Sequence, residues 1–104
     1  MASVRWTVGA QEDLRAIVEY IRQDSPTYAA ATALRIVAAV ERLRRHPKLD
    51  RRVPEFENPT IRELIVRNYR VVYQLRGQRV GIVAIVHGSR DLLRHIGKEE
   101  WSFE

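Results

Sequence analysis

The amino-acid sequence predicts an α+β domain, in which a short N-terminal strand and a two-helix hairpin pack on a small antiparallel sheet. Apolar residues recur with helical spacing over the first half of the chain, and the spacing changes to the alternation of strands from residue 61 onward. Two short turns divide that second half into consecutive strands, which is typical of an antiparallel meander. A chain of 104 residues has room for one domain, which we expect to span 1–104 with a loosely packed tail over 98–104.

The first strand is predicted by alternating apolar residues, and the first helix by apolar residues at helical spacing. Val4, Trp6 and Val8 alternate with polar residues, which predicts a short half-buried strand. The helix after it is expected to have Glu12 and Asp13 in its first turn, where carboxylates suit the positive end of the helix dipole. Its apolar face has the spacing i, i+3, i+4 and i+7, and consists of Leu14, Ile17, Val18 and Ile21.

Ser25 and Pro26 predict the start of the second helix, with Ser25 as the N-cap and Pro26 as the first helical residue. Pro47 is expected to end it. The alanines of the helix allow close approach to the first helix in an antiparallel hairpin. Six residues are expected to form its buried stripe: Ala29, Ala33, Ile36, Val37, Val40 and Leu43.

The second half of the chain predicts a loop and three strands. The loop over 47–60 holds three of the four prolines. The strands are expected over 61–66, 69–75 and 79–87, with turns at 67–68 and 76–78. The third strand is almost continuously apolar, which predicts a central strand covered on both faces. The segment 91–97 is expected to form a short helix or an edge strand.

The composition limits the function classes. The chain has 18 basic and 13 acidic residues, a formal net charge of +5, and 16 arginines against two lysines. Arginine favours bidentate recognition of carboxylates, phosphates or bases, although a GC-rich genome would give the same excess. Without cysteine there is no disulfide, thiolate zinc site or cysteine nucleophile. The three scattered histidines predict no metal site, and we expect no cofactor.

Two further exclusions concern location. No apolar run approaches the roughly 20 residues of a membrane span. The first seven residues lack the apolar stretch of a signal peptide. We therefore expect a cytoplasmic protein with no membrane partner.

Several short motifs, taken in order, carry a family resemblance. They are the apolar positions of 13–21, the Ser25-Pro26 pair, RVPE at 52–55, IREL at 61–64, YRVVY at 69–73 and VHGSRD at 86–91. At these spacings the chain resembles the RelE/ParE superfamily of toxins from bacterial type II toxin–antitoxin modules. The VPE, IREL and HGSRD segments look more like the ParE branch than the RelE branch.

The resemblance implies two N-terminal helices on a strongly twisted antiparallel sheet, and an antitoxin that wraps the toxin in a hetero-oligomer. RelE-like members cut mRNA in the ribosomal A site. ParE-like members share the fold but are held to inhibit DNA gyrase, with no nuclease chemistry established.

If the chain is a nuclease, its candidate catalytic residues are His87, Arg70, Arg62 and Tyr73. Metal-free RNA cleavage needs a base, an acid and cations for the phosphate, and these side chains could supply them. Against a nuclease, 61–87 contains no lysine, and the late aromatics, Trp101 and Phe103, are not tyrosines.

Each candidate also has a structural interpretation. His87 could simply lie at the rim of a strand end. Arg70 could pair with Glu63 across the sheet, and Arg62 with Glu63 could form a solvated pair. Tyr73 could pack in the core or on a sheet face.

The binding interpretation rests on charge. Type II antitoxins tend to be acidic in the segment that binds the toxin, and an arginine-rich surface complements that charge. Helix-in-groove docking and strand addition at a sheet edge are both open. The candidate binding residues are Arg51, Arg52, Arg62, Arg70, Arg90 and Trp101.

The leading hypothesis is thus a ParE-like toxin that arrests growth by inhibiting DNA gyrase through protein contact and is neutralised by an antitoxin. The alternative is a RelE-like, ribosome-dependent mRNA endonuclease. A second alternative is a basic nucleic-acid-binding module, which fits the charge but leaves the ordered motifs unexplained.

Overall fold

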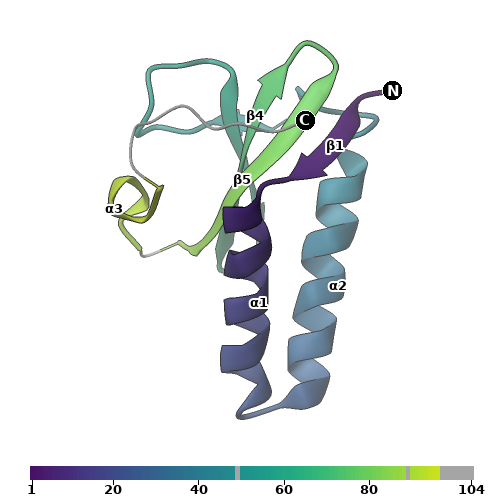
Figure 1. The fold of residues 1–104 in the computed structure, drawn as a ribbon, viewed down its shortest axis with the longest axis vertical. Helices are drawn as coiled ribbons and strands as arrows, with labels where there is room; N and C mark the ends of the chain where they lie inside the picture. The colour runs from purple at the N-terminus through teal and green to yellow at the C-terminus, as the bar shows by residue number, and fades with distance from the viewer. Residues whose placement is uncertain (49, 89, 97–104) are drawn as a thin grey trace.

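The computed structural model describes residues 1–48, 50–88 and 90–96, so the predicted tail lies outside it. Its elements are β1 (Ser3–Trp6), α1 (Val8–Arg22), α2 (Pro26–Arg42), β2 (Arg51–Arg52), β3 (Ile61–Val66), β4 (Tyr69–Arg76), β5 (Arg79–His87) and α3 (Leu92–Ile96). The strands form one sheet in the order β1-β5-β4-β3-β2. Figure 1 shows α1 and α2 side by side below the sheet, which confirms the predicted α+β architecture.

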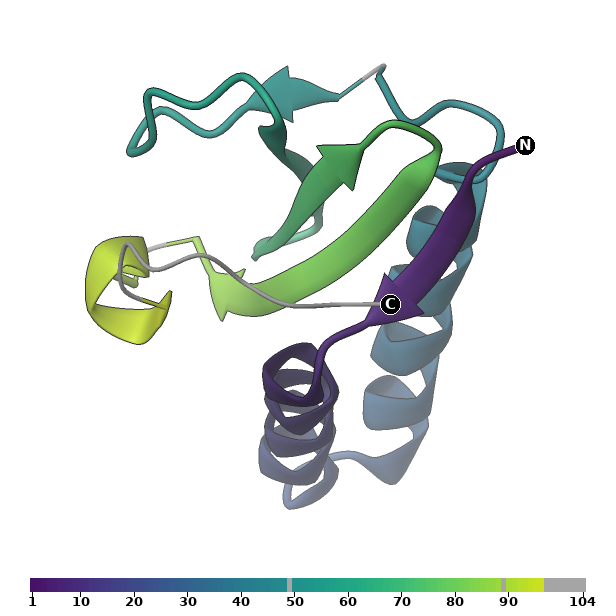
Figure 2. The same cartoon turned by 45° about the horizontal axis from the view of Figure 1, so that its top comes forward.

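The sheet extends the predicted meander at both edges. β3, β4 and β5 pair antiparallel as expected, and β2 adds antiparallel to β3. β1 pairs with β5 in parallel, so the sheet is mixed rather than purely antiparallel. Figure 2 shows how strongly the strands twist and curl around one another. β5 therefore lies between β1 and β4, and its residues 80–86 are all buried, as its apolar run predicted.

The junction of β1 and α1 corrects one prediction. The strand ends at Trp6, and Val8 is the first helical residue, with 70% of its surface exposed. Thr7 is the N-cap: its hydroxyl accepts from the Ala10 amide at 3.1 Å and donates to the Ile82 carbonyl at 2.9 Å. The helix thus begins early enough that its first turn contains no acidic residue, so the prediction for Glu12 and Asp13 is wrong.

The second helix begins as predicted. Ser25 accepts a hydrogen bond from the Tyr28 amide at 3.1 Å, and Pro26 is the first helical residue. The helix ends at Arg42, well before Pro47. Four of the six stripe residues are buried, and Ala33 is half-buried, but the prediction for Val37 is wrong because that side chain is 40% exposed. Thr32 and Ala39 complete the buried face instead.

Two turns hold the meander together. Arg67 and Gly77 have φ angles of 57° and 60°, which places both turn residues in the left-handed region. The register between β4 and β5 shifts between Val72 and Tyr73, a β-bulge that adds local twist.

The sheet separates two hydrophobic clusters. The larger lies between the sheet and the hairpin, and includes Ile36, Val71 and Tyr73. The smaller lies on the opposite face, where Val53 and Leu92 cover strand residues such as Val72 and Val83. The alternation predicted for β4 is confirmed by this division. Of the two alternatives for 91–97, the short helix is correct.

Within the parts of the chain that the structure describes, no helix is long and apolar enough to span a bilayer.

Candidate interaction surface and the buried ion-pair network

Arg70 is the centre of a network of ion pairs on the sheet face away from the hairpin. Its Nε donates to Glu63 Oε1 at 2.6 Å, and its two terminal nitrogens donate to the two carboxylate oxygens of Glu55 at 2.7 Å each. In register Arg70 stands opposite Ile65, so it reaches Glu63 diagonally, two residues along β3. The predicted alternative of an Arg70–Glu63 pair is therefore confirmed.

Glu63 is completely buried and is held from both sides. Arg51, its register partner on β2, donates from Nε to Glu63 Oε2 at 2.6 Å. Two carboxylates and two guanidinium groups thus balance one another at this site. The hydrogen bonds from Arg70 hold the pKa of Glu55 below its usual range, and those to Glu55 raise the pKa of Arg70 further.

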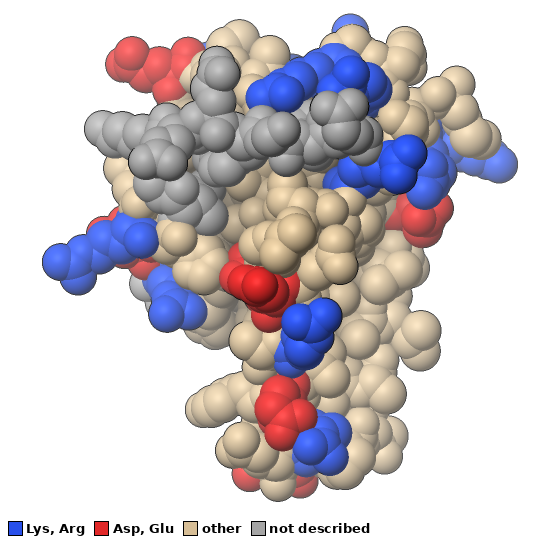
Figure 3. Space-filling view, viewed as in Figure 1, with Lys and Arg blue, Asp and Glu red and all other residues tan. Residues whose placement is uncertain are grey.

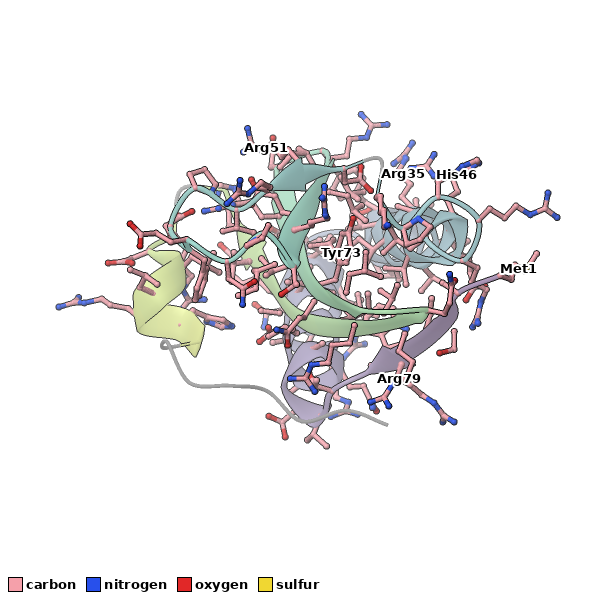
Figure 4. All side chains as sticks on the ribbon, turned by 90° about the horizontal axis from the view of Figure 1, so that it is seen from above. Met1, Arg35, His46, Arg51, Tyr73 and Arg79 are labelled. Atoms are coloured by element: carbon pink, nitrogen blue, oxygen red, sulfur yellow. The ribbon has the colours of Figure 1, made fainter. Side chains whose placement is uncertain are left out.

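Arg62 and Tyr73 face the opposite side of the sheet from this network. They are register partners, and Tyr73 is fully buried, with its hydroxyl donating to the Pro47 carbonyl at 3.0 Å. Burial raises the pKa of the Tyr73 phenol. Arg62 donates to the Asp50 carbonyl at 2.8 Å, so it does not form a solvated pair with Glu63. Figure 4 shows Tyr73 inside the molecule and Arg51 at its outer edge.

His87 is the last residue of β5, and it lines an open hollow of about 340 Å³ together with Arg51 and Arg70 of the ion-pair network. Its ring meets the ring of Tyr69 edge to face, with centroids 5.7 Å apart and planes at 85°. Burial raises the pKa of Tyr69, and charge repulsion with the nearby phenol groups of Tyr28 and Tyr20 raises it further. Of the four candidate catalytic side chains, Arg70 and His87 therefore line one hollow, whereas Arg62 and Tyr73 are bound to Asp50 and Pro47 elsewhere, so the four do not converge on one point.

An open groove of about 420 Å³ lies between α1, the end of β5 and α3. Its polar residues are Asp13, His87, Arg90 and His95, and its apolar lining consists of Ala16, Ile17, Tyr20, Tyr69, Ile85 and Val86. Of the candidate binding residues in the described chain, only Arg90 reaches this groove.

Asp13 builds one wall of the groove. Its Oδ2 accepts from the Ile85 amide at 3.0 Å, and its Oδ1 lies 2.9 Å from His95 Nε2. The Asp13 carboxylate thus connects α1, β5 and α3. Position in the sequence gives no hint of this role, because the partners are 72 and 82 residues away.

The candidate binding residues do not form one patch. Arg51 and Arg52 are exposed on the edge strand β2, and Arg90 is exposed beside the groove. Arg62 and Arg70 are engaged in the internal contacts above. Trp101 lies outside the described residues. The tyrosines of the groove were not among the candidates, although Tyr20 continues the apolar face of α1 three residues after Ile17.

No group of three or more histidine, aspartate or glutamate side chains is arranged to hold a metal ion in the described ranges 1–48, 50–88 and 90–96.

Two antiparallel helices on one face of a twisted meander are the arrangement that the resemblance to the RelE/ParE superfamily implies, so fold and topology define a protein of that class. The chain belongs to the family of ParE toxins of type II toxin–antitoxin systems (parDE), whose model matches residues 4–92. That range includes both long helices and every strand except the first residue of β1.

Individual relatives agree. Toxin RelE2 of Caulobacter vibrioides is 40% identical over 91 residues, which are 86% of this chain and 99% of that protein. A chain of the chromosomal ParDE system from P. aeruginosa superposes with a TM-score of 0.70 at 27% identity, covering 84% of this chain and 96% of that one. A chain of the toxin–antitoxin complex RelBE2 from Mycobacterium tuberculosis has a TM-score of 0.59 at 22% identity, with coverage of 83% and 96%, and shares the fold alone.

Proposed function

We propose that this type II toxin arrests growth by binding DNA gyrase and inhibiting it, and that a cognate antitoxin neutralises it in the cytoplasm. The observation that carries the proposal is the commitment of the sheet's charged groups to internal contacts. Arg70 donates to Glu63 at 2.6 Å and to both carboxylate oxygens of Glu55 at 2.7 Å.

Metal-free RNA cleavage requires a base, an acid and a cation that converge on one phosphate. In this chain the Arg70 charge is balanced by two carboxylates, and the Tyr73 phenol is buried with its hydroxyl bonded to backbone. His87 is the last residue of β5, and in the hollow that it lines with Arg70 the guanidinium charge is already neutralised by Glu55 and Glu63. A neutralised arginine and a buried phenol support inhibition by protein contact over catalysis.

For the antitoxin we propose helix-in-groove docking between α1 and the end of β5. The groove supplies an apolar floor through Ile17, Tyr69 and Ile85, and positive charge through Arg90. An amphipathic segment with apolar anchors and flanking carboxylates would match both. The family to which the chain belongs and the similar structure from P. aeruginosa are both of toxin–antitoxin systems, which supports an antitoxin partner for this chain.

One observation favours the alternative of a ribosome-dependent endonuclease. The relative that is 40% identical is named Toxin RelE2. His87 and Arg90 at the groove would then be the groups nearest to RNA, with Tyr69 as a stacking ring.

The decisive experiment measures both activities of the purified chain. We expect inhibition of DNA supercoiling by gyrase, and no cleavage of mRNA on translating ribosomes. In cells without antitoxin, we expect filamentation and DNA breaks while protein synthesis continues. Cleaved mRNA with intact supercoiling would establish the endonuclease instead. DNA or RNA binding without either activity would favour a basic nucleic-acid-binding module.

Variants at the strand end refine the result. His87→Ala and Arg90→Ala should abolish cleavage if the chain is a nuclease, because they remove the groups nearest to RNA. If the chain instead inhibits gyrase, its toxicity does not depend on an acid or a base at these positions, so neither variant should lose toxicity for that reason. Circular dichroism of each variant verifies that it is folded.

A further inference from the structure

The outer face of α2 is apolar although it faces away from the core. Leu34 is 71% exposed and Val37 is 40% exposed. With 100° per residue, these two side chains share one side of the helix with Ala30 and Ala38, opposite the buried Ile36. Surface helices usually place charged residues there, so this helix is apolar on two sides.

α2 has three charged residues. Arg35 lines a separate hollow beside Tyr28 and Thr32, and Glu41 and Arg42 lie in the last turn of the helix. Figure 3 shows the contrast: acidic and basic residues alternate down α1, whereas the surface over the lower part of α2 is uncharged. The exposed apolar stripe of α2, from Ala30 to Ala38, therefore contains no charged side chain of its own, and Glu41 lies at its end.

The charge of the hairpin identifies the kind of partner. Residues 8–42 contain five acidic and four basic side chains, a net charge of −1. The whole chain carries +5, so the remainder carries +6. An acidic segment would be attracted to that remainder and not to α2. A partner for the stripe should itself be uncharged and apolar, which describes the same stripe on a second copy.

The stripe is also self-complementary. In an antiparallel pair centred on Leu34, each Ala30 faces Ala38 of the other copy, and the two Leu34 side chains meet on the two-fold axis. At the ends, Thr27 faces Glu41 of the other copy, an acceptor for its hydroxyl. Alanine on both sides of leucine allows the close approach that helix packing requires.

We infer that this toxin forms a two-fold symmetric homodimer through the outer face of α2. The inference goes beyond the proposed function and does not depend on gyrase or antitoxin. A helix of 17 residues is about 25 Å long, and one such pair buries less than a standard interface of roughly 1,600 Å². The dimer is therefore weak, with a dissociation constant in the micromolar to millimolar range. Because both copies are positive, added salt strengthens it.

The test is sedimentation equilibrium of the purified 104-residue chain over ~1 μM to 1 mM. We expect a monomer–dimer equilibrium, and Leu34→Glu should raise the dissociation constant at least about 10-fold, because each copy loses a buried leucine. Val8→Glu is the matched control, since Val8 is 70% exposed on α1 and lies off the stripe. Dimerisation must persist in the control.

The absence of cysteine gives a second, independent readout. Leu34→Cys should form an intermolecular disulfide on mild oxidation, because the two positions meet on the axis, whereas Val8→Cys should not. A chain that stays monomeric at 1 mM, or that dimerises equally well with Leu34→Glu, overturns the inference. A Leu34→Glu chain that loses only antitoxin binding would assign the stripe to the antitoxin and would also overturn it.

Discussion

Glu63 is the residue whose environment matters most for the sheet. It has no exposed surface, yet it carries a carboxylate that two arginines neutralise from opposite sides. Buried ion pairs contribute little net stability, but removing one partner leaves a charge without compensation. The network therefore makes Arg70 a structural residue irrespective of any role in binding.

We predict that Arg70→Met destabilises the fold by about 3 kcal/mol, at the lower end of the range for breaking a buried pair, because Arg51 remains beside Glu63. Chemical unfolding monitored by circular dichroism measures it. Arg52→Met on the exposed edge strand is the control and should change stability by less than about 0.5 kcal/mol. Equal losses in the two variants would contradict the importance of the network.

The sequence predicts on which face of the sheet each of these side chains lies, but it does not predict all of the contacts between them. Alternation puts Arg70 and Glu63 on adjacent strands, and their pairing was among the expectations. Glu55 comes from a loop in which apolar residues have no regular spacing. Nothing in the sequence therefore indicates that both of its carboxylate oxygens accept from Arg70 at 2.7 Å. The same limit applies to Asp13 and His95, which long-range packing brings to 2.9 Å.

Among the elements, the loop before β3 depends on Glu55. The pKa of the Glu55 carboxyl is lowered from 4.5 by the hydrogen bonds from Arg70. A carboxyl with a lower pKa in the folded chain stabilises the fold above its unfolded pKa, and this stabilisation is lost as pH falls through the folded value. Asp50 acts in the opposite direction, because burial raises its pKa.

We therefore predict that Glu55→Gln lowers the melting temperature at pH 7 and has a progressively smaller effect as the pH falls from about 5 toward 3. Thermal unfolding across this pH range gives the difference between the two chains, in which the contribution of Asp50 cancels. Glu57→Gln, an exposed change in the same loop, provides the control. A difference that stays constant with pH would mean that the carboxylate charge is not involved.

The start of α1 shows how a cap competes with a strand pattern. Alternation through Val8 predicted a longer strand, but the Thr7 hydroxyl satisfies the amide of Ala10 and begins the helix at once. Sequence reasoning gave Ser25 this role correctly, because Pro26 follows it. Thr7 lacks such a neighbour, and its second bond, to Ile82, depends on tertiary structure.

Thr7→Ala should cost about 1–2 kcal/mol, since it removes both the cap and the contact with β5. Ser25→Ala is the comparison. It removes only a local cap on an exposed amide, and should cost less, about 1 kcal/mol. Urea unfolding of both variants measures the two values. If Ser25→Ala proved the more damaging change, the bond from Thr7 to β5 would contribute nothing.

For the molecule as a whole, the fold class was predictable because helices and strands with strong periods fill most of the chain. The parallel pairing of β1 was not, because a four-residue strand carries no mark of its partner. The difference in net charge between residues 8–42 and the rest of the chain can be counted from the sequence. Only the fold shows that this difference separates the hairpin from the sheet. The structure gathers residues 8–42, with a net charge of −1, into a hairpin and leaves the excess positive charge on the sheet half.

This division predicts how salt and charge reversal affect association with an acidic antitoxin. Electrostatic steering acts mainly on the association rate, so Arg52→Glu on the sheet half should lower that rate several-fold at low salt. Arg35→Glu makes the same change in charge on the hairpin and should have the smaller effect. Stopped-flow binding at increasing NaCl concentration measures both, and the difference should vanish as the salt screens it. Equal slowing by the two reversals would show that net charge alone, rather than its position on the fold, directs the antitoxin.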